Sequence, residues 1–246
     1  MSDSIFLIRS KDRTSASTSS SNFKISLAKE IWGKYQVLYV QIYNTFYSVQ
    51  TGLNDTIYFN ENSTNKTATL PAGLYTTSGS ASILTAIGTA MTTASGGFAT
   101  FTATLGASSQ FITISSTQNF SLKFGTNTAP SLPSAANVLG FANSDTSAAT
   151  SAVATNVPNL GGPTDISISI EEAGSNEWIN GQGAYGQLLI PMNVSWGSLK
   201  YYSAYEFPQL IEFDRPQQTI SVKIKDTDNN LRSLNGSEWV IAIRRL

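Results

Sequence analysis

The sequence contains no cysteine and no histidine among its 246 residues. Without cysteine, no disulfide framework, thiolate nucleophile or Cys/His zinc site can form. Without histidine, no Ser-His-Asp or Cys-His arrangement can form, and the side chain best suited to proton transfer near neutral pH is missing. We therefore predict a non-enzymatic protein that uses no cofactor and no metal.

Charged residues are also scarce. They make up 13% of the chain, and 15 Lys and Arg nearly balance 16 Asp and Glu. A near-neutral chain without a Lys/Arg-rich stripe argues against sequence-specific recognition of nucleic acid. The longest apolar runs, such as Leu188–Ile190 and Trp239–Ile243, are too short to cross a bilayer, so we expect no transmembrane anchor. The first ten residues show no secretory signal, and we expect the protein to remain in a reducing compartment.

Alternation of apolar and polar residues recurs along the chain and predicts half-buried strands. In Asn22–Leu27, for example, the aromatic and aliphatic residues alternate with asparagine, lysine and serine. An Asn-Gly pair at 235–236 predicts a tight turn before the last strand. The other expected strands are Val37–Tyr47, Ile57–Phe59, Ala99–Leu105, Ile112–Ile114, Phe120–Phe124, Ile166–Ile170, Gln187–Met192, Leu199–Tyr205, Leu210–Phe213, Ile220–Ile224 and Trp239–Ile243.

One segment has helical spacing instead. Apolar residues recur every three to four positions in Ile83–Met91, with Ser80 or Ser82 as the N-cap and Gly96-Gly97 as the stop. A long stretch, Thr126–Thr164, is rich in Pro, Ser, Ala, Asn and Gly and predicts irregular structure. Within it, residues 138–141 predict a short helical turn.

These elements favour an all-β fold, an antiparallel jelly-roll sandwich with a small α+β insertion that contains one helix. We expect residues 1–21 to form an N-terminal strand followed by a basic, Ser/Thr-rich run, which we interpret as a flexible arm or an exposed loop. Residues 22–70 and 164–246 would form the jelly roll, and residues 71–163 the insertion.

Three groups of residues could carry chemistry, and each also has a purely structural interpretation. Paired carboxylates could serve a glycosidase, but acidic residues in turns are ordinarily solvated. The oxygen-rich run Asp226–Asn230 lacks the glycine and the terminal glutamate of a twelve-residue calcium loop, and an Asx-type turn is favoured. Exposed tyrosines could stack on sugars, although core or interface packing is favoured. The carboxylates are Glu171, Glu172, Glu177, Glu206, Glu212 and Asp214, and the tyrosines are Tyr201, Tyr202 and Tyr205.

Both ends of the chain carry a family likeness. The segment Ile8–Arg13, followed by a Ser/Thr spacer and Ser21–Leu27, resembles the start of penton and minor capsid proteins of the double-jelly-roll virus lineage, which includes virophages, polinton-like viruses and related large DNA viruses. The segment from Leu70 to Phe141 is similar to a module common in such proteins. The C-terminal segment, Ile220–Asp228 with Asn235–Trp239, is similar to the last hairpin of these proteins.

The resemblance implies a single jelly roll whose copies form a homopentamer at the five-fold vertices of an icosahedral capsid. Its partners would be the major capsid protein and other minor capsid proteins, and its location the virion, after assembly inside the host cell. The candidates for the assembly interface are Arg9, Lys11, Arg13, Phe23, Arg244 and Arg245. The alternatives are a viral receptor-binding spike or fibre head, with Thr126–Thr164 as contacts, a carbohydrate-binding β-sandwich, and a glycosidase that depends on Glu177 or Glu206.

Overall fold

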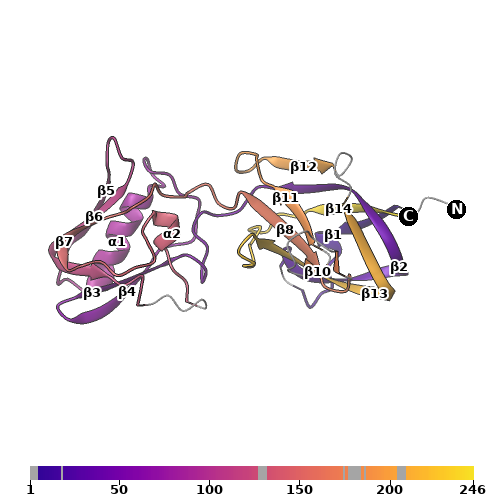
Figure 1. The fold of residues 1–246 in the computed structure, drawn as a ribbon, viewed down its shortest axis with the longest axis horizontal. Coiled ribbons are helices and arrows are strands. Elements are labelled where there is room, and N and C mark those ends of the chain that lie inside the picture. The colour runs from indigo at the N-terminus through magenta and orange to yellow at the C-terminus, as the bar shows by residue number, and fades with distance from the viewer. Residues whose placement is uncertain are drawn as a thin grey trace. The chain divides into compact units, whose positions relative to one another are not determined.

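The structure is a computed structural model that describes residues 5–17, 19–126, 132–173, 175–176, 184–185, 187–203 and 209–246. The chain divides into two compact units, each with its own strands (Figure 1). We call Met1–Phe46 with Pro163–Leu246 the sandwich unit, and Tyr47–Gly162 the inserted unit.

The sandwich unit is built on one seven-stranded sheet in which every described pairing is antiparallel. Its strand order is β1-β14-β2-β13-β8-β11, and β12 pairs with β2 beside this path. A 3-10 helix, η1 (Ser10–Asp12), follows β1, and a small hairpin pairs β9 (Ser175–Asn176) with β10 (Ala184–Tyr185). The strands are β1 (Ile5–Arg9), β2 (Asn22–Tyr43), β8 (Asp165–Ile170), β11 (Gln187–Pro191), β12 (Leu199–Ser203), β13 (Leu210–Asp226) and β14 (Val240–Arg245).

Two long strands, β2 and β13, let this one sheet curl around a core. The first part of β2 pairs with the end of β13, whereas its last part pairs with β14 and β12. The register between β2 and β13 shifts twice around Gln217, near Gly33, which has a φ of 88°. A left-handed residue without a Cβ and an irregular register allow sharp bending, so the two halves of each strand can lie on different walls.

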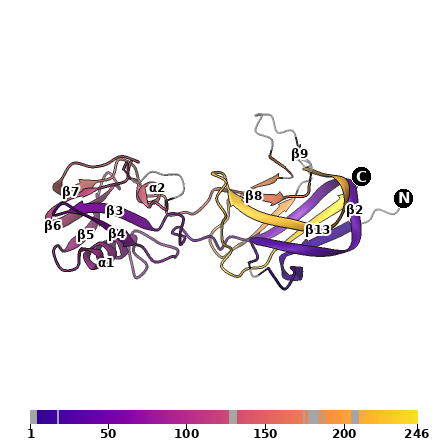
Figure 2. The same cartoon turned by 90° about the horizontal axis from the view of Figure 1, so that it is seen from below.

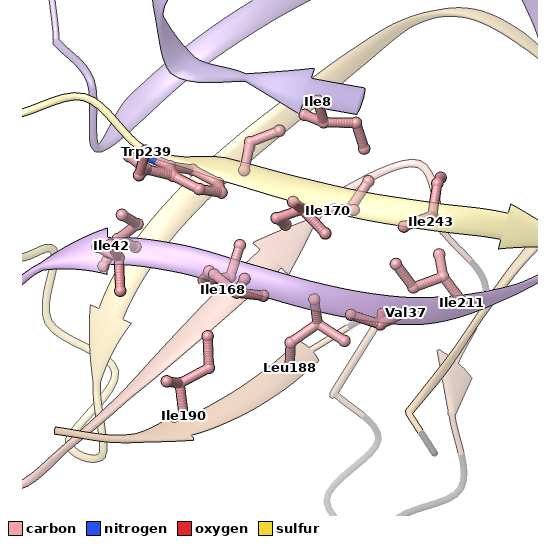
Figure 3. Close-up of a cluster of buried hydrophobic side chains, with 14 of the residues drawn as sticks. Ile8, Val37, Ile42, Ile168, Ile170, Leu188, Ile190, Ile211, Trp239 and Ile243 are labelled. Carbon is pink, nitrogen blue, oxygen red and sulfur yellow. The ribbon is translucent and has the colours of Figure 1, made fainter. Parts of the chain in front are cut away.

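Side chains from the inner face fill the space between the walls (Figure 3). Ile168, Ile190 and Ile241 are fully buried there. Trp239 meets Phe23 edge to face at 5.8 Å, and its indole N–H donates to the Ser20 carbonyl over 2.6 Å. The buried indole therefore has its one donor satisfied, and it ties the segment before β2 to the start of β14.

The inserted unit has a five-stranded sheet with a helix along one side (Figure 2). Its strand order is β4-β3-β6-β5, with β7 paired to β6. Helix α1 begins after Ser82, whose hydroxyl accepts from the Leu84 N–H, and ends at Gly96, which has a φ of 68°. Both caps agree with the sequence prediction. The elements are β3 (Thr56–Glu61), β4 (Thr64–Thr69), α1 (Ile83–Ser95), β5 (Phe101–Leu105), β6 (Ile112–Leu122), α2 (Ala136–Leu139) and β7 (Ala149–Val153).

The expected fold class is confirmed: an antiparallel jelly-roll sandwich with a small α+β insertion. The boundary before the insertion differs from the expected one, because the inserted unit begins at Tyr47 rather than at residue 71. Strands β3 and β4 have the same alternation as jelly-roll strands, but their apolar residues belong to the core around α1. The stretch expected to be irregular also contains β7 and the predicted helical turn, α2.

The start of the chain forms the predicted strand, β1, paired with β14. The Ser/Thr-rich run that follows it does not behave as a free arm where the structure describes it. Thr14 donates its N–H to the Lys24 carbonyl over 2.8 Å, the Ser17 hydroxyl accepts from the Lys24 N–H, and Ser20 is buried. Serine and threonine side chains can satisfy backbone groups locally, so a run without apolar residues is held by hydrogen bonds.

Candidate assembly face

One face of the sandwich sheet points away from the core and carries large apolar side chains. Directly paired residues of neighbouring strands point to the same side of a sheet. The pairing Leu7–Ala242–Tyr39 and the pairing Arg9–Val240–Gln41–Tyr201 therefore each place one row of side chains on this outer face. We call this surface the assembly face; its residues are Ile5, Leu7, Arg9, Gln36, Tyr39, Gln41, Tyr43, Leu199, Tyr201, Val240, Ala242 and Arg244.

The assembly face is unusually apolar for a solvated surface. Ile5 is 59% exposed, Leu7 48% and Tyr201 55%, and both Tyr43 and Leu199 are also exposed. Tyr201 stacks on Tyr39 with 5.7 Å between ring centroids and 24° between planes. Single exposed apolar side chains are ordinary, but a contiguous group on four neighbouring strands is typical of a surface that binds another protein.

Arg9 and Lys11, two of the predicted interface residues, lie together at one end of this face. Both line a hollow of about 240 Å³ whose walls include Tyr43, Leu199 and Glu238. Arg9 forms an ion pair with Asp12. The hollow therefore combines two cations with an apolar wall and one carboxylate.

Glu238 links this hollow to Arg13, the third predicted cation. Its carboxylate accepts from Arg13 Nη1 over 2.7 Å and from the Ser10 hydroxyl. Partial burial raises the pKa of Glu238, but the hydrogen bonds from Ser10 and Arg13 and the charges of Arg13 and Lys11 outweigh it, so its pKa lies below the usual value. Arg13 also donates to the Ser10 carbonyl over 2.8 Å. Its guanidinium is thus bonded within the subunit and holds the Glu238 carboxylate in place.

The two arginines at the end of β14 have different surroundings. Arg244 lies on the assembly face opposite Ile5 and donates to the Gln36 amide oxygen over 2.8 Å. The guanidinium of Arg245 lies 4.6 Å from the ring centroid of Trp32, which is 53% exposed. This cation–π pair lies on the bend of β2, outside the assembly face.

Phe23 lies in the core of the sandwich unit and not on the assembly face. It is 2% exposed and packs against Trp239 within the sandwich core. The alternation in Phe23–Leu27 predicted a half-buried strand correctly, and the same pattern directs Phe23 inward, away from the assembly face.

Three of the acidic residues weighed for catalysis, Glu171, Glu172 and Glu212, are held by structural partners. Glu172 accepts from the Ser221 N–H and hydroxyl over 2.6 and 2.7 Å, and Glu171 pairs with Lys223. Glu212 lies 3.7 Å from Lys34. Residues Glu177, Tyr205 and Glu206 lie outside the described residues.

The oxygen-rich run after β13 forms a turn of the Asx kind, as predicted. One carboxylate oxygen of Asp226 accepts from the N–H groups of Asp228 and Asn230 over 3.0 and 2.9 Å. The other oxygen lies 3.7 Å from the Arg232 guanidinium. Asp226 thus stabilises the turn itself.

Sequence reasoning missed the aliphatic members of the assembly face. A signal for them exists in β1, where Ile5–Ile8 is apolar at every position. A strand covered on one face alternates apolar with polar residues, whereas a strand apolar on both faces has a second surface to cover. Charge singled out Arg9, Lys11 and Arg244, which remain interface candidates, and its aromatic ring singled out Tyr201. Leu7 and Leu199 required the strand register.

No family model matches the chain, and no curated protein matches it. None of the described helices has the length and hydropathy needed to cross a membrane. Among solved structures, the chain is similar to the mavirus penton protein, with a TM-score of 0.42 and 9% sequence identity over 98% of this chain and 99% of that one.

Proposed function

We propose that this protein is a structural subunit of a viral capsid, a vertex subunit that forms homopentamers through the assembly face. The observation that carries the proposal is the contiguous apolar surface on β1, β14, β2 and β12, which a monomer would leave in water. The major capsid protein, with other minor capsid proteins, would surround the pentamer in the virion. The proposed role is mechanical and needs no chemistry from the chain.

In the proposed pentamer, the assembly face would supply one of the two patches that a ring needs. In a cyclic ring each subunit presents two different patches, and one patch of each copy meets the other patch of its neighbour. An apolar centre bordered by polar and charged side chains has the composition of a protein interface. Arg9 and Lys11 at one end of the assembly face would then receive an acidic side chain of the neighbour.

Sedimentation velocity of the purified chain tests this proposal. We expect a species with five times the 26.4 kDa mass of the chain. Replacing Leu7 or Tyr201 by aspartate buries a charge in the interface, so we expect dissociation to be favoured by at least thirtyfold, about 2 kcal/mol. A wild-type chain that stays monomeric at high concentration, alone and with the major capsid protein, would refute the proposal.

Leu189→Asp is the matched control. Leu189 is 42% exposed, lies on β11 of the same sheet and is outside the assembly face. The same charge introduced there should leave the sedimentation pattern unchanged. If all three aspartate variants dissociate alike, the apolar face is not the interface.

A second candidate function rests on the tyrosines of the same face. Exposed Tyr201, stacked on Tyr39 and close in register to Tyr43, offers aromatic surface of the kind that binds sugar rings. A receptor-binding or carbohydrate-binding domain would show saturable binding to a glycan array, and Tyr201→Ala would abolish it. The capsid role predicts no such binding.

A further inference from the structure

The inserted unit contains a groove between strand β4 and helix α1. It has a volume of about 560 Å³. On the strand side it is lined by Thr67–Thr69, and on the helix side by small residues that recur along α1, among them Ala86, Ala90 and Ala94. None of the residues that line it is charged. A stripe of small residues would not define a site alone, but the other wall of this groove is a strand edge.

The hydrogen bonding of β4 shows which of its backbone groups face the groove. Leu70 donates its N–H to the Asp55 carbonyl over 2.7 Å, and at the other end the two-residue turn closes on the pair Glu61–Thr64. Bonded pairs in an antiparallel ladder alternate with non-bonded pairs. The pairs that bond to β3 therefore include Thr64, Lys66 and Ala68.

The N–H and C=O groups of Thr67 and Thr69 consequently point away from β3. Strand β4 is the last strand of its sheet, and within the described part of the chain no backbone hydrogen bond engages these outward groups. An open strand edge favours pairing with another strand. Here the open edge borders an uncharged groove, so the edge and the groove would be covered by the same ligand.

We propose that the groove between β4 and α1 binds an extended, uncharged segment of a partner protein, which pairs with the free edge of β4 as an additional strand. Main-chain hydrogen bonds to Thr67 and Thr69 would hold the segment, and every second side chain would pack against the alanines of α1. Small or medium apolar side chains suit that wall. A second copy of the inserted unit is a poorer fit, because two copies of the same concave groove are not complementary in shape.

The probe is a synthetic heptapeptide, Thr-Val-Thr-Ala-Thr-Val-Thr with blocked ends, added to the full-length isotope-labelled protein. We expect saturable NMR shifts confined to β4 and α1, and exchange of the Thr67 and Thr69 amide protons slowed at least tenfold at saturation. The same peptide with glutamate in place of valine should not bind. If the uncharged peptide produces no saturable change, the proposal fails.

Thr67→Pro tests the strand pairing. Proline is tolerated where an edge N–H faces outward, so this change removes the proposed donor with little effect on β4 itself. We expect the peptide affinity to fall at least about fivefold, the loss of one hydrogen bond. Ala90→Arg fills the groove from the helix side and should also weaken peptide binding. This second variant tests the proposal if Thr67→Pro does not fold.

The matched control lies on the opposite edge of the same sheet. Thr117 donates to the Thr100 carbonyl and Gly106 to the Phe111 carbonyl, so the alternation places the Ala103 N–H on the free edge of β5. Ala103 borders a different hollow beside α1, so Ala103→Pro should leave binding in the β4 groove, read from the Thr67 and Thr69 amides, unchanged. Equal weakening by both proline variants would overturn the proposal. Loss of self-association in Thr67→Pro would assign the groove to another copy of the chain, and would also overturn it.

Discussion

At the scale of single residues, two carboxylates of the inserted unit lie in opposite environments. Glu61 on β3 is 2% exposed, and neither of its carboxylate oxygens has a hydrogen-bond partner among the described residues. Asp145 is exposed and accepts hydrogen bonds from the Gly125 and Thr126 N–H groups over 2.9 and 2.8 Å. The first should destabilise the fold and the second should stabilise it.

Replacing Glu61 by methionine should raise the free energy of unfolding of the inserted unit by about 1–3 kcal/mol, because an unpartnered polar group leaves the apolar interior. Urea denaturation, followed by far-ultraviolet circular dichroism, measures the change in the free energy of unfolding. Glu172→Gln is the contrasting variant, since both oxygens of Glu172 are bonded to Ser221, and we expect it to be destabilising. A Glu61→Met protein less stable than the wild type would show that this carboxyl has an important partner.

Asp145 should make stability depend on pH. Partial burial raises the pKa of its carboxyl, but hydrogen bonds from Thr126, Lys123 and Gly125 lower it to about 2, from an ordinary value of 3.8. A lowered pKa in the folded state contributes stability above pH 3.8, which is lost as the pH falls through 2. Asp145→Asn should therefore be less stable than the wild type at neutral pH, with the difference vanishing near pH 2. A carboxyl pKa near 3.8 in an NMR titration would contradict this.

At the scale of elements, one side chain closes the edge of β11. The Gln209 amide accepts from the Leu189 N–H and donates to the Leu189 carbonyl, each over 3.1 Å, and also donates to the Tyr202 hydroxyl. Its geometry imitates the two hydrogen bonds of a neighbouring strand. An edge that would otherwise be open is thus covered without any further strand.

Gln209→Ala should lower the free energy of unfolding of the sandwich unit by about 1–3 kcal/mol, because it leaves the partly buried N–H and carbonyl of Leu189 without their partner. Hydrogen exchange of the Leu189 amide should also become faster. Gln218→Ala, at an exposed position of β13, should change neither quantity. Unchanged exchange at Leu189 in the Gln209 variant would mean that water replaces the amide fully.

The strands were largely predictable, but their continuity and pairing were not. Alternation located Phe23–Leu27 and Val37–Tyr47, yet the structure joins them into β2, because Ile31 and Tyr35 continue the inward side across the bend. Ile57–Phe59 was found as a strand and placed in the wrong unit, since alternation says that a face is buried and not which core buries it. The assembly face needed register, which depends on residues two hundred positions apart, such as Leu7 and Ala242.

At the scale of the whole molecule, the two units have separate cores. The core of the inserted unit, around Ile87, Phe101 and Leu139, draws all its residues from Tyr47–Gly162. The residues that flank this segment belong to the sandwich unit, where the Asn44 N–H donates to the Ser198 carbonyl and the Thr164 carbonyl accepts from the Met192 N–H. A segment that has its own core and its own sheet satisfies the usual requirement for independent folding.

We therefore expect Tyr47–Gly162, expressed alone, to unfold in one cooperative transition, with a calorimetric enthalpy of about 80 kcal/mol near 60 °C for a unit of this length. The full chain should show the same transition as a distinct component. The stability of the inserted unit comes from its own core and therefore does not depend on the core of the sandwich unit. Glu61→Met should shift this component upward, and Gln209→Ala should shift only the remaining one. A single transition in the full chain that moves as a whole with either substitution, together with an isolated segment that lacks a cooperative transition, would show that the units fold only together.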